Sequence, residues 1–440
     1  PEGPLPFTTR EVQIRVRGQA PVTMRLRETR HGPVVSDLDP EPRRGEGTVL
    51  ALAMAALAPA DTPAIGLLAL NRAGSIAEAR AAAALITSPP QNLMVADAAG
   101  GIALFLTGRI PVRRTGDGTI PVRGWEGGPA WTGFLAFESL PHIEAPASGV
   151  IANANNRVAP PDHPAFLTRD WPGDWRFRRI GELLAARERH DPAGFAAMQA
   201  DIHSVFAREA LARFRALPRP EGIAGAALDR LRAWDGAMAA DRPEPLIFHA
   251  TLRRFGAAAL AAGGVPAGAW EAAPEFLAHL LHRDGRGAPW CGAEGCDALL
   301  GAALRESVAD LAARHGPDPA AWRWGPAHVA RFEHPLLRFV PGLGALTRLA
   351  TPTAGDGETL LRAAFRGGPD FANVHGAGLR IVADLGSPAG LRAVIATGQS
   401  GHPMSRHWGD QLPAWRDGAT LELGLLGTDA RSMLRLRPGP

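Results

Sequence analysis

The chain has 440 residues, of which 46% are hydrophobic and 21% are charged, so it is long enough to bury one large core or two smaller ones. All 47 basic residues are arginine and tyrosine is absent, which excludes a lysine Schiff base, a P-loop lysine, a lysine general base and a tyrosine nucleophile. The net charge of +3, with arginines interspersed among acidic residues, argues against a nucleic-acid partner, and no apolar run reaches the about 18 residues of a membrane span.

Two β-hairpins are predicted in the first part of the chain. Alternating apolar and polar residues predict one over residues 11–17 and 22–27. Two apolar runs around a glycine-rich turn predict another over residues 92–97 and 102–106. An alanine-rich helix is predicted between the hairpins, over residues 76–86.

A short buried strand is predicted over residues 149–152, and it leads into a run that contains Asn153, Asn155 and Asn156. Amides at the end of a strand can direct N–H donors to one point, as a developing oxyanion requires. The alternative is an asparagine-rich loop whose side chains satisfy its own backbone.

From about residue 176 the apolar residues recur with a helical period, which predicts a series of helices. The predicted helices cover residues 176–189, 192–217, 223–240, 245–255 and 298–315.

Strands return near the C-terminal end, at residues 378–385 and 391–397. The order of sheet, helices and sheet predicts the α+β class. It divides the chain into a sheet region over residues 1–175, a helical region over residues 176–320 and a C-terminal segment over residues 321–440 that returns to the sheet.

The two cysteines, Cys291 and Cys296, are separated by four residues. Without a second cysteine pair or nearby histidines they do not form a zinc site. We interpret them as a small disulfide in an exported protein, and two unlinked thiols are the alternative.

A metal-dependent hydrolase could be built on His402, His407 and Asp410, which follow one another closely. Pro403 argues against the helix that would place two histidines on one face, so this interpretation is the weaker one.

Several segments together resemble the β chain of the penicillin acylase family of N-terminal-nucleophile hydrolases. The resemblance covers nearly the whole chain in the family's order, and the loop around the two cysteines is similar to one found in a branch of the family. The matching segments are residues 28–35, 90–97, 108–111 and 152–157, Arg176, residues 179–180 and 375–376, Arg380, and residues 384–385 and 398–402.

The resemblance implies a four-layer αββα sandwich, incomplete in this chain, with a helical insertion. Family members are periplasmic or secreted, are cut from an autoproteolytic precursor, and act as a heterodimer of an α-chain and a β-chain. Their nucleophile is an N-terminal serine whose α-amino group is the base, because an α-amine titrates close to working pH. Attack on an N-acyl amide gives an acyl-enzyme and then a free acid, as in antibiotic or acyl-homoserine lactone hydrolysis, and no cofactor is required.

The resemblance also implies roles for individual residues. Asn155 matches the asparagine that donates its amide to the oxyanion, and Arg176 matches the arginine that orients the active site. Gln91 and Asn92 fall in the substrate-binding region, and the polar Gln91 argues against phenylacetyl-type specificity. A structural calcium ion would be bound by residues that match Gly118 and either Asp162 or Asp170.

The family's β chain begins with the nucleophile, on a segment that precedes the residue matching Pro1. The resemblance therefore implies that the nucleophile lies upstream of this sequence and that the isolated chain is inactive. Ser75 follows a glycine, as an autocleavage site would, but it begins a helical pattern. A non-catalytic ligand-binding protein or a degenerate acylase is the alternative.

Overall fold

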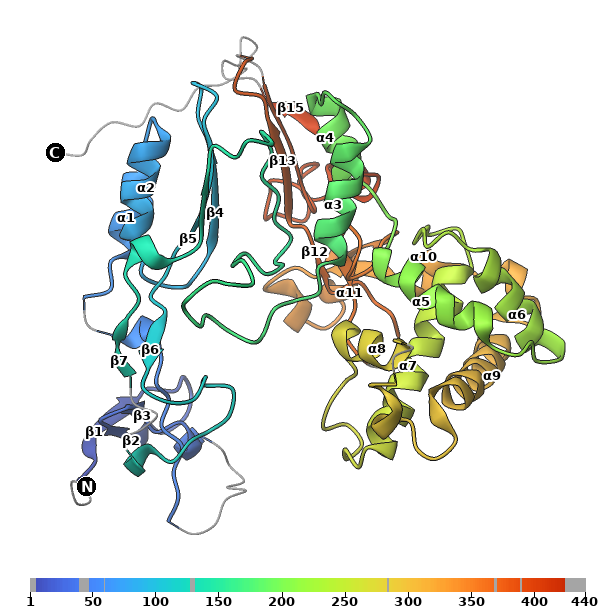
Figure 1. Ribbon diagram of the computed structural model, residues 1–440, viewed down its shortest axis with the longest axis horizontal. Coiled ribbons are helices and arrows are strands. Elements are labelled where there is room, and N and C mark those ends of the chain that lie inside the picture. The colour runs from blue at the N-terminus through green and yellow to red at the C-terminus, as the bar shows by residue number, and fades with distance from the viewer. Residues whose placement is uncertain are drawn as a thin grey trace. The chain divides into compact units, whose positions relative to one another are not determined.

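The computed structural model describes residues 5–38, 47–58, 60–126, 131–282, 285–367, 370–387 and 390–423, which belong to two compact units, residues 1–171 and residues 172–440. Both units contain helices and antiparallel strands, so the predicted α+β class is confirmed (Figure 1). The predicted boundary after residue 175 lies close to the division between the units, whereas the one after residue 320 lies inside the second unit. Within the described ranges, no helix is both long enough and apolar enough to cross a membrane.

The first unit consists of small antiparallel sheets and two α-helices. Its described strands are β1 (Thr8–Ile14), β2 (Val22–Thr29), β3 (Gly32–Pro33), β4 (Asn92–Ala96), β5 (Ile102–Leu106), β6 (Pro111–Arg113), β7 (Trp131–Phe134) and β8 (His142–Glu144). Its described helices are α1 (Pro63–Leu70), α2 (Ile76–Ala84) and the 3-10 helices η1 (Ser36–Leu38), η2 (Ala55–Leu57), η3 (Gly124–Glu126) and η4 (Phe137–Ser139). The strands pair in the orders β1-β2-β3, β4-β5-β8 and β6-β7.

The β4-β5 hairpin carries the residues that lead to the site. Helix α2 contacts both strands (Figure 1), and Ala83 of α2 packs with Ala103 and Phe105 of β5 in a small core. The carboxylate of Asp97 accepts a hydrogen bond of 2.8 Å from the N–H of Gly101, which closes the turn between the strands. Both predicted hairpins and the predicted alanine-rich helix are confirmed.

The strand predicted over residues 149–152 is wrong, because no described strand includes these residues. Gly149 has a φ of 66°, in the left-handed region, so the chain turns where a strand would stay extended. Val150 is exposed, and its carbonyl oxygen accepts a local hydrogen bond of 3.2 Å from the hydroxyl of Ser148. The asparagine run therefore follows a loop rather than a strand end.

The second unit is mainly helical. Its described α-helices are α3 (Trp175–Ala185), α4 (Pro192–Gln199), α5 (Val205–Ala216), α6 (Gly222–Ala233), α7 (Glu244–Ala262), α8 (Pro274–Leu281), α9 (Gly295–His315), α10 (Trp324–Ala327), α11 (Leu343–Thr347) and α12 (Leu412–Arg416). Its described 3-10 helices are η5 (Ala288–Trp290), η6 (Pro319–Ala321) and η7 (Leu337–Phe339). Its described strands are β9 (Val329–Phe332), β10 (Leu349–Pro352), β11 (Ala363–Ala364), β12 (His375–Gly376), β13 (Leu379–Ala383), β14 (Leu391–Ile395) and β15 (Leu421–Leu423).

The largest core of the second unit lies among α5, α6, α7 and α9 (Figure 1), where Leu211, Phe248 and Leu304 are buried. Cys291 and Cys296 belong to the same core and form a disulfide bond. The predicted disulfide is therefore confirmed, and the alternative of two unlinked thiols is wrong.

The single helix predicted over residues 192–217 is two helices, α4 and α5. The hydroxyl of Ser204 accepts a hydrogen bond of 3.2 Å from the N–H of Ala207 and so caps the start of α5. Asp201, in the interruption, binds Arg179 of α3. Apolar residues recur on both sides of this break, in α4 and in α5, so the period alone does not reveal it.

The C-terminal part of the second unit contains the sheet β13-β14-β15, and the two predicted strands are confirmed. Helix α4 contacts β13, where the side-chain amide of Gln199 donates a hydrogen bond of 2.9 Å to the carbonyl oxygen of Ile381. Trp415 of α12 packs with Ala330 and Val394 in a separate small core.

Candidate active site

The loop of the first unit that contains Asn153, Asn155 and Asn156, here called the asparagine loop, is held by the side chains of its first and last asparagines. The side-chain oxygen of Asn153 accepts hydrogen bonds from the N–H of Asn155, at 3.2 Å, and from the side-chain amide of Asn92, at 3.3 Å. The side-chain oxygen of Asn156 accepts a hydrogen bond of 3.0 Å from the N–H of Ala154. Asn153 and Asn156 therefore have the structural role given above as the alternative, since their side chains accept hydrogen bonds from the backbone N–H groups of the loop.

Asn155 differs from its neighbours, because it is exposed and has a φ of 64° in the left-handed region. Asparagine tolerates this conformation better than most residues, but it still costs free energy and marks a position that the surrounding loop determines. An exposed carboxamide on a rigid turn is suited to donate N–H groups to an oxyanion. This role remains a prediction.

The predicted substrate-binding residues take different places. Asn92 begins β4 and is linked to the asparagine loop by its bond to Asn153. Gln91 is exposed, and its carbonyl oxygen accepts a hydrogen bond of 2.9 Å from the N–H of Thr107. The structure thus brings Asn92 to the loop, and it fixes Gln91 through the backbone while the side chain remains accessible.

The residues predicted for calcium lie on exposed loops, since Asp162 and Asp170 are both exposed. Next to Gly118, the carboxylate of Asp117 accepts a hydrogen bond of 2.6 Å from the hydroxyl of Thr119 and pairs with Arg169. These hydrogen bonds, from Thr119 first and Arg169 next, hold the pKa of Asp117 well below its ordinary value. Since the Asp117 carboxylate is paired with an arginine, the geometry around Gly118 does not by itself indicate a bound cation. The calcium site remains a prediction.

The other candidate residues have structural roles. In the described parts of the chain, no three or more His, Cys, Asp or Glu side chains are grouped to hold a metal ion, so His402, His407 and Asp410 do not form the metal site that was considered. His407 bonds Asp410 at 2.6 Å, whereas Nδ1 of His402 accepts a hydrogen bond from the N–H of Met404. Ser75 caps α2, since its hydroxyl accepts a hydrogen bond of 3.3 Å from the N–H of Glu78.

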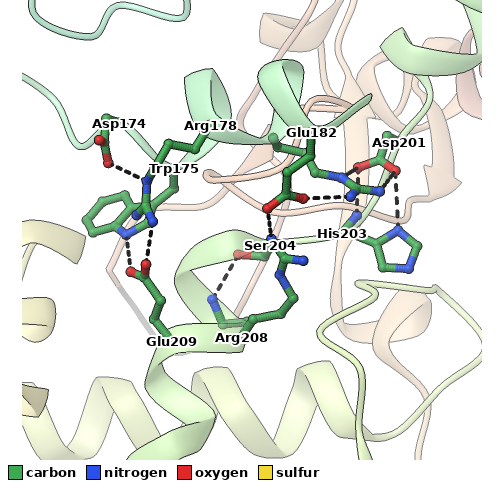
Figure 2. Close-up of polar contacts among 11 residues, drawn as sticks. Asp174, Trp175, Arg178, Glu182, Asp201, His203, Ser204, Arg208 and Glu209 are labelled. Carbon is green, nitrogen blue, oxygen red and sulfur yellow. Dashed lines mark hydrogen bonds and ion pairs between the residues drawn. The ribbon is translucent and has the colours of Figure 1, made fainter. Parts of the chain in front are cut away.

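In the second unit, Arg176 lies in the first turn of α3, between residues that are tied to α5. Glu209 of α5 accepts a hydrogen bond of 2.9 Å from the indole N–H of Trp175, and it forms an ion pair of 2.5 Å with Arg178 (Figure 2). Arg178 also pairs with Asp174 at 2.9 Å (Figure 2). Residues on both sides of Arg176 are therefore fixed by a single carboxylate.

A second set of ion pairs fixes the next turn of α3. Arg179 donates two hydrogen bonds, of 2.9 and 2.7 Å, to the carboxylate of Asp201, which also contacts His203 (Figure 2). Glu182 joins the set by pairing with Arg179 and Arg208 (Figure 2). Burial of Asp201 by itself would raise its pKa, but the hydrogen bonds from Arg179 and His203 outweigh burial and lower it. The helix that carries Arg176 is thus anchored along its length.

The side chain of Arg176 is 11% exposed, and its Nε lies 4.0 Å from a carboxylate oxygen of Glu358, which is 15% exposed. Glu358 and the neighbouring Asp356 are residues that the sequence analysis missed. The only signal for them is a pair of acidic residues within a glycine-rich stretch, a pattern that loops commonly show.

Comparison with known proteins decides the family. The sequence profile of the penicillin amidase family matches residues 1–429. The chain belongs to the penicillin amidase family. This confirms the resemblance that the ordered segments of the sequence indicated.

Two curated relatives of this penicillin amidase family chain match along nearly its whole length. The chain is 32% identical over 443 residues to penicillin acylase 2 proenzyme of Pseudomonas sp. (strain SE83), a match that covers 95% of this chain and 54% of the relative. It is 30% identical over 467 residues to acyl-homoserine lactone acylase QuiP of Pseudomonas aeruginosa, with 94% of this chain and 54% of the relative covered. The chain thus spans about half the length of the curated relatives it matches.

A solved structure shows the same fold. Thermostable penicillin G acylase from Alcaligenes faecalis matches with a TM-score of 0.72 and 20% sequence identity, over 99% of this chain and 82% of that chain.

Proposed function

We propose that this chain is part of the β-chain of an acylase, an enzyme that hydrolyses the amide bond between an acyl group and an amine. The observation that carries the proposal is the family match over residues 1–429, supported by two relatives named as acylases. The complete protein would have the four-layer αββα sandwich, with an α-chain from the same precursor as its partner.

The reaction would use an N-terminal serine on a segment upstream of this sequence. Its α-amine, with an ordinary pKa of about 8, removes the proton of the serine hydroxyl as that oxygen attacks the amide carbonyl. Asn155 donates an N–H from its carboxamide to the oxyanion that develops. The amine leaves after it gains the proton, and water then hydrolyses the acyl-enzyme and regenerates the serine.

Arg176 would orient the site from the anchored helix α3. Its charge persists at any working pH, because a guanidinium stays protonated even where burial lowers its pKa, as it does here. The substrate class is a small N-acyl amide, such as an acyl-homoserine lactone or a β-lactam amide. The polar Gln91 argues against a phenylacetyl group as the preferred acyl portion.

The site of action would be the periplasm or the exterior of a bacterial cell. The Cys291–Cys296 disulfide is consistent with this compartment, because disulfides persist in oxidising environments.

The test is to express the full precursor and assay the processed protein against a panel of acyl-homoserine lactones and β-lactam amides. We expect release of amine, and mass spectrometry of a slow substrate reaction should find the acyl group on the newly formed N-terminal serine. Replacement of that serine by alanine is the control. Binding of panel compounds without any turnover would instead support a non-catalytic ligand-binding protein.

A further inference from the structure

The loop that joins β10 to β11, residues 353–362, consists of buried and half-buried residues and is anchored on several sides. The N–H of Gly355 donates a hydrogen bond of 2.8 Å to the carbonyl oxygen of Met238, and the indole N–H of Trp324 donates one of 3.0 Å to the carbonyl oxygen of Gly355. The hydroxyl of Thr359 accepts a hydrogen bond of 2.9 Å from the N–H of Asp356. This loop is therefore a rigid platform inside the second unit.

Asp356 of this loop faces a histidine of the helical core. Its side chain is 1% exposed and one carboxylate oxygen lies 3.2 Å from Nε2 of His249 on α7. His249 stacks on Trp324, which stacks in turn on His328. The other carboxylate oxygen of Asp356 accepts a hydrogen bond of 2.7 Å from the N–H of Glu358. Asp356 thus connects the core histidine to the backbone of Glu358.

A carboxylate oxygen of Glu358 lies 4.0 Å from Nε of Arg176, which is within ion-pair distance and longer than a hydrogen bond. The other charged groups that act on Glu358 are Asp356 and Arg362 of the same loop and Glu275 of α8. Two acidic and two arginine side chains therefore influence this carboxyl group, and Arg176 is the one that the resemblance assigns to the active site.

We propose that Glu358 is a positioning residue for Arg176, and that Asp356 and His249 hold Glu358 in the required place. This inference rests on the proposed function only in placing Arg176 at the acylase site. The contact between Glu358 and Arg176 can be tested without any catalytic activity.

The proposal makes the positioning of Arg176 dependent on pH. Burial first, and the charge of Asp356 next, raise the pKa of Glu358 to about 8, while Arg176 acts in the opposite direction. The carboxyl group is therefore protonated at neutral pH and becomes an anion in mildly alkaline solution. Its attraction to Arg176 strengthens as it ionises.

The decisive experiment measures the ionisation of Glu358 in the full processed protein by isotope-edited infrared spectroscopy of glutamate carboxyl groups. A band of protonated carboxyl should disappear with a midpoint near pH 8 and be absent from Glu358→Gln. Arg176→Gln removes a nearby positive charge and should raise the midpoint by about one pH unit or more. Asp356→Asn removes a nearby negative charge and should lower it.

Arg219→Gln is the matched control, because it removes an exposed arginine that pairs with Asp229 elsewhere in the unit. It should leave the midpoint unchanged. If Arg176→Gln fails to fold, two other variants still test the electrostatic coupling between Arg176 and Glu358. Asp356→Asn should lower the midpoint, and the charge-conserving Arg176→Lys should leave it near that of the wild type. A midpoint that responds to neither Arg176→Gln nor Asp356→Asn overturns the proposal.

Kinetics give a second measurement. In the processed enzyme, Glu358→Gln mimics the protonated carboxyl group, so kcat should stay close to that of the wild type at pH 7 and fall about tenfold or more below it above pH 8, with little change in KM. Glu358→Asp should recover part of kcat. Coupled titration without any acylase turnover would refute the proposed function and leave the Glu358–Arg176 contact intact, whereas a wild-type kcat in Glu358→Gln above pH 8 overturns the positioning role.

Discussion

Replacement of Asn155 by glycine and, separately, by alanine distinguishes a catalytic asparagine from a structural one. Both variants lack the side-chain amide but keep the N–H that bonds Asn153 at 3.2 Å. They differ in the backbone, because φ at this position is 64°, which glycine adopts freely and alanine does not.

The expected magnitudes follow from these two differences. Loss of one oxyanion donor should lower kcat by about 10²–10³, equivalent to about 3–4 kcal/mol of transition-state stabilisation, in both variants. An alanine held in the left-handed conformation costs about 1–2 kcal/mol, so Asn155→Ala should unfold more readily than Asn155→Gly by about that amount.

The assays are steady-state kinetics of amine release by the processed precursor and urea unfolding of the same preparations. Wild-type turnover in Asn155→Gly would show that Asn155 is not an oxyanion donor. Equal unfolding free energies for the two variants would show that the loop does not hold this residue in the left-handed region.

Three further measurements test the second unit. Burial lowers the pKa of His328 from an ordinary 6.5 to about 4, so between these two pH values the unfolded chain binds a proton that the folded chain does not. The free energy of unfolding should therefore fall by about 3 kcal/mol as the pH drops from 6.5 to 4. His328→Gln should flatten this pH dependence in urea unfolding, and an unchanged slope would contradict the burial argument. Asp201→Asn should lower the free energy of unfolding by about 2 kcal/mol or more, because it breaks a mostly buried ion pair. Asp229→Asn, which breaks an exposed ion pair, should lower it by less than about 1 kcal/mol. Equal losses in the two variants would refute this difference between buried and exposed pairs. Reduction of the Cys291–Cys296 bond should lower the free energy of unfolding by about 2 kcal/mol at most, because the residues are only 5 apart in sequence. A larger loss, measured by unfolding in the presence of a reductant, would indicate that the bond supports the core.

Local pattern determined much of the fold. The apolar runs of β4 and β5 and the helical period of α9 reflect which residues of each element are buried, and both can be recognised from neighbouring residues. The order of short segments was sufficient to indicate the family that the profile match then established. The asparagine run was also visible in the sequence, although the division of roles between Asn155 and its flanking residues was not.

Tertiary structure alone decided where charged residues meet. The helix predicted over residues 192–217 is interrupted where Asp201 binds Arg179, a pairing that no periodicity encodes. The same holds for the contacts of His249 with Asp356 and of Arg176 with Glu358, which join α7, a connecting loop and α3 and arise only when these elements fold together. The sequence by itself determined the elements and the family, because burial patterns are local, and it left the electrostatic surroundings of Arg176 to the packing of distant segments.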